Sequence, residues 1–91
     1  MNVHYVKCVQ PWFDYCCSGL KTFEVRKNDR DYRKGDILIL KEYDLVAVEN
    51  GGMAEYTGRE KSFEITLVLY DEDVKGIQTG YCVMGIKAIE A

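Results

Sequence analysis

The sequence predicts a small domain of mixed α/β class that is mainly β: a barrel of about five strands with one main helix after the first strand. Five segments carry the β-branched or alternating apolar patterns of strands. Only one short segment, beside the chain's single proline, has helical spacing. No βαβ alternation follows, so a mixed or antiparallel barrel is favoured over a parallel sheet. The 91 residues suffice for one domain, which we take as residues 1–91.

The first strand and the helix are predicted from the N-terminal part of the chain. Residues 3–9 read Val-His-Tyr-Val-Lys-Cys-Val, a pattern typical of a strand. Pro11 then suits the first turn of a helix. An apolar stripe follows at spacings of three and four residues: Phe13, Cys16, Cys17 and Leu20. Gly19 suits the left-handed position that ends such a helix.

The second strand is predicted over residues 22–27. Alternate side chains of a strand point to opposite faces, so the two apolar residues share one face, whereas Glu24 and Arg26 share the other. Lys21 comes directly before this strand. The parity therefore predicts that the charged groups of Lys21, Glu24 and Arg26 lie close together.

Three more strands are predicted over residues 37–40, 62–69 and 80–89. The first is an unbroken apolar run after a turn, which fits either a strand covered on both faces or a highly twisted barrel strand. The second alternates strictly, with one face formed by Phe63, Ile65, Leu67 and Leu69. Between these two strands, residues 43–57 have the composition of a long flexible hairpin connection. In the last strand, Gly85 is expected at a bulge or a close-packing point.

Basic residues are concentrated in residues 19–35. This segment holds six of the chain's 12 lysines and arginines and three acidic residues, so its net charge is +3 in a chain of net charge −3. Such an asymmetry indicates an anionic partner at one edge of the molecule. The overall acidity argues against tight, sequence-independent binding to nucleic acid and is compatible with a pocket for one base or nucleotide.

The composition predicts a cytoplasmic protein with no membrane contact, no metal and no cofactor. No segment approaches the roughly 20 apolar residues of a membrane span, and the first residues lack the pattern of a signal peptide. The four cysteines include no Cys-x-x-Cys pair, and His4 is the only histidine, so a zinc site is not expected. We expect reduced cysteines that pack as small hydrophobic residues.

Residues 19–26 read Gly-Leu-Lys-Thr-Phe-Glu-Val-Arg. This run resembles the signature of ASCH domains, Gly-x-Lys-x-x-Glu-x-Arg. Nearly the whole chain is similar to a small phage and bacterial ASCH-like family, in blocks at residues 4–7, 27–30, 35–38, 42–44, 56–60 and 80–81. The resemblance implies the PUA-like fold, a β-barrel whose cleft beside the first helix is lined by the motif. That superfamily contains many RNA-binding modules.

The motif residues offer chemistry that suits a nucleotide. Arg26 presents a planar fork for a phosphate or a base edge, and Lys21 presents a mobile point charge. Glu24 can hold either cation in place or accept a hydrogen bond from a base amino group. Tyrosines are available for stacking on bases: Tyr5, Tyr32, Tyr43, Tyr56 and Tyr81. The alternative is an exposed ion-pair network of little energetic value.

Further candidate binding residues lie outside the motif. A basic cluster follows it: Lys27, Arg30, Arg33 and Lys34. These four either contact phosphates or form a solvated surface. Arg59 or Thr57 lies either at the mouth of the cleft or in a simple turn, and Tyr81 is a candidate contact. His4 is expected to be a structural strand residue, whereas Trp12 is either core cover or an exposed contact.

The sequence thus predicts a monomeric RNA- or nucleotide-binding module with its cleft around Lys21, Glu24 and Arg26. Two alternatives stay open. One small ASCH-like branch consists of amidohydrolases that deacylate modified cytidines with a lysine, a threonine three residues later and a distant glutamate. Lys21 matches that lysine, but Glu24 occupies the threonine position, so these two residues would be the catalytic candidates. The other alternative is a phage or bacterial protein-interaction module that uses the acidic remainder of the surface.

Overall fold

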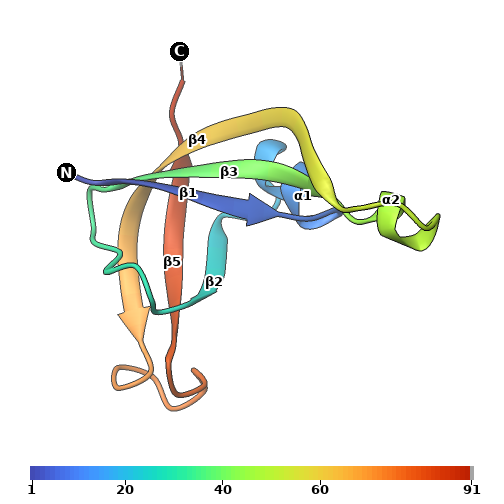
Figure 1. Ribbon diagram of the computed structural model, residues 1–91. Coiled ribbons are helices and arrows are strands. Elements are labelled where there is room, and N and C mark those ends of the chain that lie inside the picture. Colours follow the sequence, from blue (N-terminus) through green and yellow to red (C-terminus); the bar gives the residue numbers. More distant parts are fainter. Residues whose placement is uncertain (91) are drawn as a thin grey trace.

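The computed structural model describes residues 1–90, which form one five-stranded sheet with two short helices (Figure 1). The strands are β1 (Val3–Cys8), β2 (Phe23–Lys27), β3 (Ile37–Asp44), β4 (Glu55–Tyr70) and β5 (Tyr81–Ala88). The helices are α1 (Trp12–Cys17) and α2 (Val46–Glu49). The predicted class is confirmed, since the fold is mainly β, has five strands, and carries its longer helix directly after the first strand.

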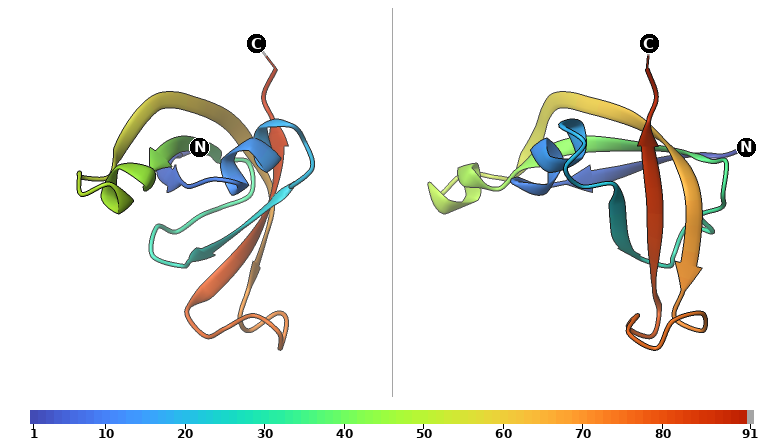
Figure 2. Two further views of the ribbon diagram at one scale, coloured as in Figure 1. Left: turned by 90° about the vertical axis from the view of Figure 1, so that its right-hand side faces the viewer. Right: turned by 180° about the vertical axis from the view of Figure 1, so that it is seen from behind.

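The sheet curls because β4 belongs to both of its halves. The strand order is β1-β3-β4-β5-β2, with β1 and β3 parallel and the other pairs antiparallel. The first part of β4 pairs with β3 and the second part pairs with β5, and the long strand bends sharply between them (Figures 1 and 2). The result is a half-barrel whose two edge strands are β1 and β2.

Arginine side chains bridge the open side of the half-barrel, between β1 and β2. Arg26 Nη2 donates to the carbonyl oxygen of Lys7 at 2.6 Å, and Arg30 Nη1 donates to that of Tyr5 at 2.7 Å. Edge carbonyls of a sheet need partners, and these guanidinium groups supply them where no strand does. Two of the predicted binding residues therefore also hold the barrel edges together.

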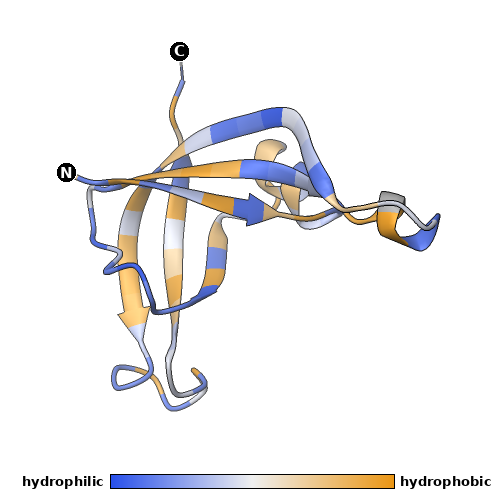
Figure 3. Cartoon of the chain, viewed as in Figure 1, coloured by the Kyte–Doolittle hydropathy of each residue, from blue (hydrophilic) through white to orange (hydrophobic). Residues whose placement is uncertain are grey.

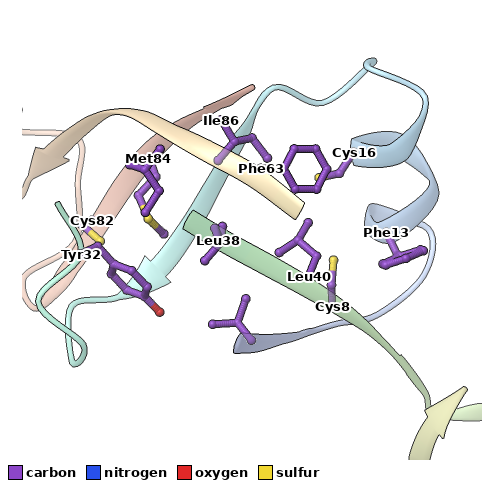
Figure 4. Close-up of a cluster of buried hydrophobic side chains, with 12 residues drawn as sticks. Cys8, Phe13, Cys16, Tyr32, Leu38, Leu40, Phe63, Cys82, Met84 and Ile86 are labelled. Carbon is purple, nitrogen blue, oxygen red and sulfur yellow. The ribbon is translucent and has the colours of Figure 1, made fainter. Parts of the chain in front are cut away.

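The hydrophobic core fills the space between the two halves of the sheet and α1 (Figure 4). It is formed by Val6, Cys8, Phe13, Cys16, Tyr32, Leu38, Leu40, Phe63, Ile65, Cys82, Met84 and Ile86. Leu38, Ile39 and Leu40 are all buried, which confirms that this strand is covered on both faces. All four cysteines are free thiols, as expected.

A β-bulge at Thr66 changes which side chains of β4 face the core. Ile65 and Leu67 are paired with successive residues of β5, so Thr66 is an extra residue. Beyond it Val68 packs against the core, whereas Leu67 is half-exposed. The predicted strict alternation is therefore wrong beyond Ile65. A Cβ on Gly85 would lie 2.6 Å from Thr66 Oγ1, so the glycine is a close-packing point, as expected.

Two local expectations also need correction. Leu20 does not extend the buried stripe of the helix, because α1 ends at Cys17 and the chain turns away at Gly19, whose φ is +82°. Leu20 is 79% exposed. The connection over residues 43–57 is more ordered than predicted, since it contains α2 and its ends belong to β3 and β4. Neither α1 nor α2, nor any other helix within residues 1–90, is long and apolar enough to cross a membrane.

His4 and Asp36 fix the start of β3 against β1. His4 Nε2 lies 2.8 Å from Asp36 Oδ2, and the histidine ring rests on Tyr32. Asp36 also accepts hydrogen bonds from the backbone N–H groups of Asn2 and Arg33. Burial by itself raises the pKa of Asp36, but these hydrogen bonds outweigh it and lower the pKa below its ordinary value. His4 is thus a structural strand residue with a partner that the sequence did not identify.

Candidate functional site

A groove of about 670 Å³ lies between α1 and the strands β1 and β2. Its most exposed members are apolar: Trp12, Tyr15, Leu20, Phe23 and Val25. Besides the buried Cys8, its least exposed members are charged, since the side chains of Glu24, Lys21 and Arg26 are 5%, 16% and 23% exposed. The groove therefore has apolar walls and a charged floor.

Local backbone geometry places the three charged residues on this floor. After Gly19 the chain turns back along the helix, and the N–H of Lys21 donates to the carbonyl oxygen of Tyr15 at 3.0 Å. The chain then enters β2, whose residues alternate between apolar and polar (Figure 3). Because β2 turns its polar face inward, Glu24 is buried, and Arg26 lies two residues further along the same face.

The carboxylate of Glu24 joins the other two motif residues. Lys21 Nζ lies 2.5 Å from Glu24 Oε1, and Arg26 Nε donates to Glu24 Oε2 at 2.9 Å. Lys21 also donates to the carbonyl oxygen of Phe23 at 2.6 Å. The predicted proximity of the three charged groups is confirmed. The alternative of an exposed ion-pair network does not hold, because Glu24 is 4% exposed.

The thiols beside this network are not suited to nucleophilic chemistry. Cys16 Sγ lies 3.5 Å from Glu24 Oε1, and Cys8 lines the groove. Burial, reinforced by the negative charge of Glu24, raises the pKa of Cys16 to about 12 and that of Cys8 to about 11. Both thiols are therefore protonated at neutral pH. Within residues 1–90, no group of three His, Cys, Asp or Glu side chains is placed to hold a metal ion.

The remaining predicted residues are distributed over other parts of the surface. Lys27 and Arg30 line a second cavity that adjoins the groove. Arg33 is highly exposed and pairs with Asp31 at 3.1 Å, outside the groove. Tyr81 begins β5 and lines a third cavity with Ile77, whereas Val25 lines both this cavity and the groove.

Arg59 and Thr57 belong to a different network within β4, so neither alternative from the sequence, the cleft mouth or a simple turn, describes them. Thr57 Oγ1 donates to Glu42 Oε1 at 2.7 Å. Arg59 lies 3.4 Å from Glu42 Oε2 and 3.3 Å from Asp14 Oδ1. Neither residue lines the groove, because β4 carries both of them to the side of α1 where Asp14 lies.

Of the aromatic residues that wall the groove, the sequence singled out Trp12 alone, without assigning it to the cleft. Trp12, Tyr15 and Phe23 are each roughly half-exposed, and the rings of Trp12 and Tyr15 meet edge to face with centroids 5.9 Å apart. Trp12 and Tyr15 are three residues apart on α1, a spacing that places two side chains next to each other on a helix and could have indicated an aromatic pair. Trp12 is therefore exposed and does not serve as core cover. Tyr32, by contrast, is 1% exposed and packs in the core, so it is not available for stacking.

Comparison with known proteins places the chain in a family. The family model described as "Domain of unknown function (DUF3850)" matches residues 3–86. The chain belongs to the DUF3850 family. The matched region of this DUF3850 domain includes every residue of the groove.

One relative comes from a bacteriophage. The "Uncharacterized 12.9 kDa protein in GpA 3'region" of Escherichia phage P2 is 38% identical over 65 residues. The match covers 71% of the present chain and 52% of the phage protein. The chain therefore matches about half the length of this relative.

Proposed function

We propose that this DUF3850 domain binds RNA or a nucleotide-like ligand through the groove beside α1, as an ASCH-like module of the PUA-like superfamily in the cytoplasm. The observation that supports this is the combination of half-exposed aromatic walls with an ordered set of charges on the floor. Aromatic side chains stack on bases of any sequence, which contributes about 1–3 kcal/mol per base. A base and its phosphate need these two kinds of surface side by side.

In this proposal Glu24 holds the two cations in place. Its oxygens accept hydrogen bonds from Lys21, Cys16 and Arg26, which occupies most of its acceptor capacity. Arg26 uses Nε on Glu24 and Nη2 on Lys7. Within the described chain, Nη1 is the part of this guanidinium that remains for a base edge or a phosphate.

The amidohydrolase alternative has less support. The resemblance requires a hydroxyl at the position of Glu24, and the carboxylate there is held by Lys21 and Arg26. The neighbouring thiols are protonated and are poor nucleophiles. We therefore expect no turnover when acylated cytidines are incubated with the protein and followed by liquid chromatography. Hydrolysis well above the uncatalysed rate, abolished in Lys21→Ala, would instead make the protein a hydrolase.

The proposal can be tested by fluorescence, because Trp12 is the only tryptophan of the chain and lies in the groove wall. Titration with mononucleotides and short single-stranded RNAs should quench its emission saturably. Arg26→Ala should weaken binding by about tenfold or more, as for loss of a hydrogen bond to a charged group, and should also change the preferred base.

Arg33→Ala is the matched control, since it removes an arginine of the same basic segment that lies outside the groove. We expect its affinity to stay within about twofold of the wild type. If no base or RNA quenches Trp12 saturably at low salt, groove binding is wrong and the protein-interaction alternative takes its place.

A further inference from the structure

Two cavities meet on the open side of the half-barrel. The groove and a second cavity of about 320 Å³ share the side chains of Lys7 and Arg26, which line both of them. The second cavity continues along β1 and the segment that follows β2, where Lys27 and Arg30 also line it. The two cavities are therefore neighbours, and a ligand seated against the aromatic walls lies next to the second cavity across Arg26.

The second cavity is strongly cationic. Its lining includes four basic side chains, Lys7, Arg26, Lys27 and Arg30, and one acidic side chain, Asp29, a net charge of +3. The whole chain has a net charge of −3. A concave site of one charge sign concentrates small ions of the opposite sign. The charge of this cavity thus points to an anionic group on the ligand.

The two arginines of this cavity are held in position before any ligand arrives. Arg30 Nη1 donates to the carbonyl oxygen of Tyr5 at 2.7 Å, and Arg26 Nη2 donates to that of Lys7 at 2.6 Å. Arg26 also donates Nε–H to Glu24, so within residues 1–90 its Nη1 group remains for an anion, whereas Arg30 retains Nε and Nη2. Binding to anchored side chains loses less conformational entropy than binding to mobile ones.

We infer that the ligand carries a phosphate that lies in the second cavity while its base lies in the groove. The preferred ligand is then a nucleotide, or an internucleotide phosphate of a single strand, and not a free nucleoside. The inference rests on the proposed function, because the groove is the base site. Arg26 lines both cavities, so in this arrangement it lies between the base and the phosphate.

Trp12 fluorescence measures this preference directly. For each base, the wild-type protein is titrated with the nucleoside, its 5′-monophosphate, its 3′-monophosphate and a dinucleotide with one internal phosphate. At least one phosphate-bearing ligand should bind about tenfold or more tightly than its nucleoside, as for one or two charged hydrogen bonds. The tightest of the three identifies whether the phosphate is terminal or internal.

Substitutions in the second cavity should remove the preference and leave the base site intact. Lys27→Ala and Arg30→Ala should each reduce the ratio of nucleotide to nucleoside affinity by about fivefold, with nucleoside affinity within about twofold of the wild type. Arg33→Ala, three residues beyond Arg30 and outside both cavities, should leave the ratio unchanged.

The outcomes separate the inference from the proposed function. Nucleosides that bind as tightly as nucleotides, or a phosphate preference that survives both Lys27→Ala and Arg30→Ala, would overturn the inference and leave groove binding standing. Absence of binding by every ligand overturns both. Arg30→Ala also removes the bond to the Tyr5 carbonyl, so Lys27→Ala, on an exposed residue, decides the question if the arginine variant does not fold.

Discussion

Two glutamates of this DUF3850 domain are both buried and both accept several hydrogen bonds, but only one of them lines a described cavity. Glu24 on β2 is held by Lys21 and Arg26, and all three line the groove; we refer to them as the Glu24 network. Glu42 on β3 is also buried, but it lines none of the three cavities described above. The same chemical group therefore lines a groove in one place and lies outside the described cavities in the other.

The partners of Glu42 differ from those of Glu24. They are Gln10, Thr57 and Arg59, which with Glu42 make up the Glu42 network. These partners tie the segment before α1 to β4, and two of them are neutral donors. The hydrogen bond from the Thr57 hydroxyl, helped by that from Gln10, lowers the pKa of Glu42 below its ordinary value despite burial, which acts in the other direction.

The difference teaches that burial of a carboxylate does not by itself mark a site. The Glu42 network consists of two neutral donors and one cation, Arg59, and none of these residues lines a described cavity, so it acts as a structural clamp. In the Glu24 network both cations line the groove, where they can offer charge to a ligand and Arg26 can offer a further N–H donor.

Removing each carboxylate charge is the strongest way to break this comparison. Glu24→Gln should lower the free energy of unfolding by about 3 kcal/mol, because it leaves the poorly exposed cations Lys21 and Arg26 without their carboxylate. Glu42→Gln should cost less, about 1–2 kcal/mol, because the partners of Glu42 are exposed to solvent. Only Glu24→Gln should also weaken nucleotide binding, by about tenfold or more. Urea denaturation followed by circular dichroism and Trp12 titrations measure the two effects. Equal losses of affinity in both variants would contradict the distinction.

Acid should act on the Glu42 network in a defined direction. A carboxyl whose pKa is lowered on folding stabilises the protein fully above its unfolded pKa, and this contribution is lost as the pH falls through the lowered value. The free energy of unfolding should therefore decrease as the pH falls below the ordinary Glu value of 4.5. Glu42→Gln should be less stable at neutral pH and should show a shallower acid decrease in urea denaturation. Asp36, whose pKa is also lowered, accounts for part of the remaining decrease. A parallel pH profile for the two proteins would show that Glu42 is not clamped as described.

The groove walls extend the comparison to two apolar residues of similar exposure. Phe23 lines the groove, whereas Leu67 is half-exposed on β4 and lines none of the three cavities. Phe23→Ala should weaken nucleotide binding by about fivefold or more, as expected for loss of base stacking. Leu67→Ala should keep affinity within about twofold. Loss of affinity in the leucine variant would place the ligand elsewhere on the sheet.

Salt dependence offers the smallest effect and compares an arginine from each region. For a short single-stranded RNA we expect a slope of log affinity against log salt of magnitude about 1.5–2, corresponding to two or three phosphate contacts. Arg30→Ala should reduce this magnitude by about 0.7. Arg59→Ala should leave it unchanged and should cost less than about 1 kcal/mol of stability, because its ion pairs are exposed. A reduced slope in Arg59→Ala would bring the Glu42 network into the binding surface.

The charged floor of the site could be predicted from the sequence because strand alternation is a local property. Once β2 is recognised as a strand, alternation alone places Glu24 and Arg26 on the same face. The walls could not be predicted in the same way. Whether Trp12 and Tyr15 face the motif or the solvent depends on how α1 packs against the curled sheet, which no local pattern reports.

The fold shows the same division between local and non-local information. Five strands and the doubly covered run over residues 37–40 follow from apolar patterns. The bulge at Thr66 depends on the register of β4 against Gly85, a residue far along the chain. The bridges from Arg26 and Arg30 to β1 likewise exist only because the curled sheet brings its two edges together.

Mapping of the ligand by nuclear magnetic resonance tests the central claim most directly. Isotope-labelled protein is titrated with a nucleoside monophosphate, and the shifts of backbone and side-chain N–H signals are followed. We predict the largest shifts at the Trp12 indole N–H, the Arg26 Nε–H and the amides of β2, with Thr57 and Arg59 unchanged. Shifts centred on Thr57 and Arg59, with the groove signals unmoved, would contradict the assignment of the Glu24 network as the binding site.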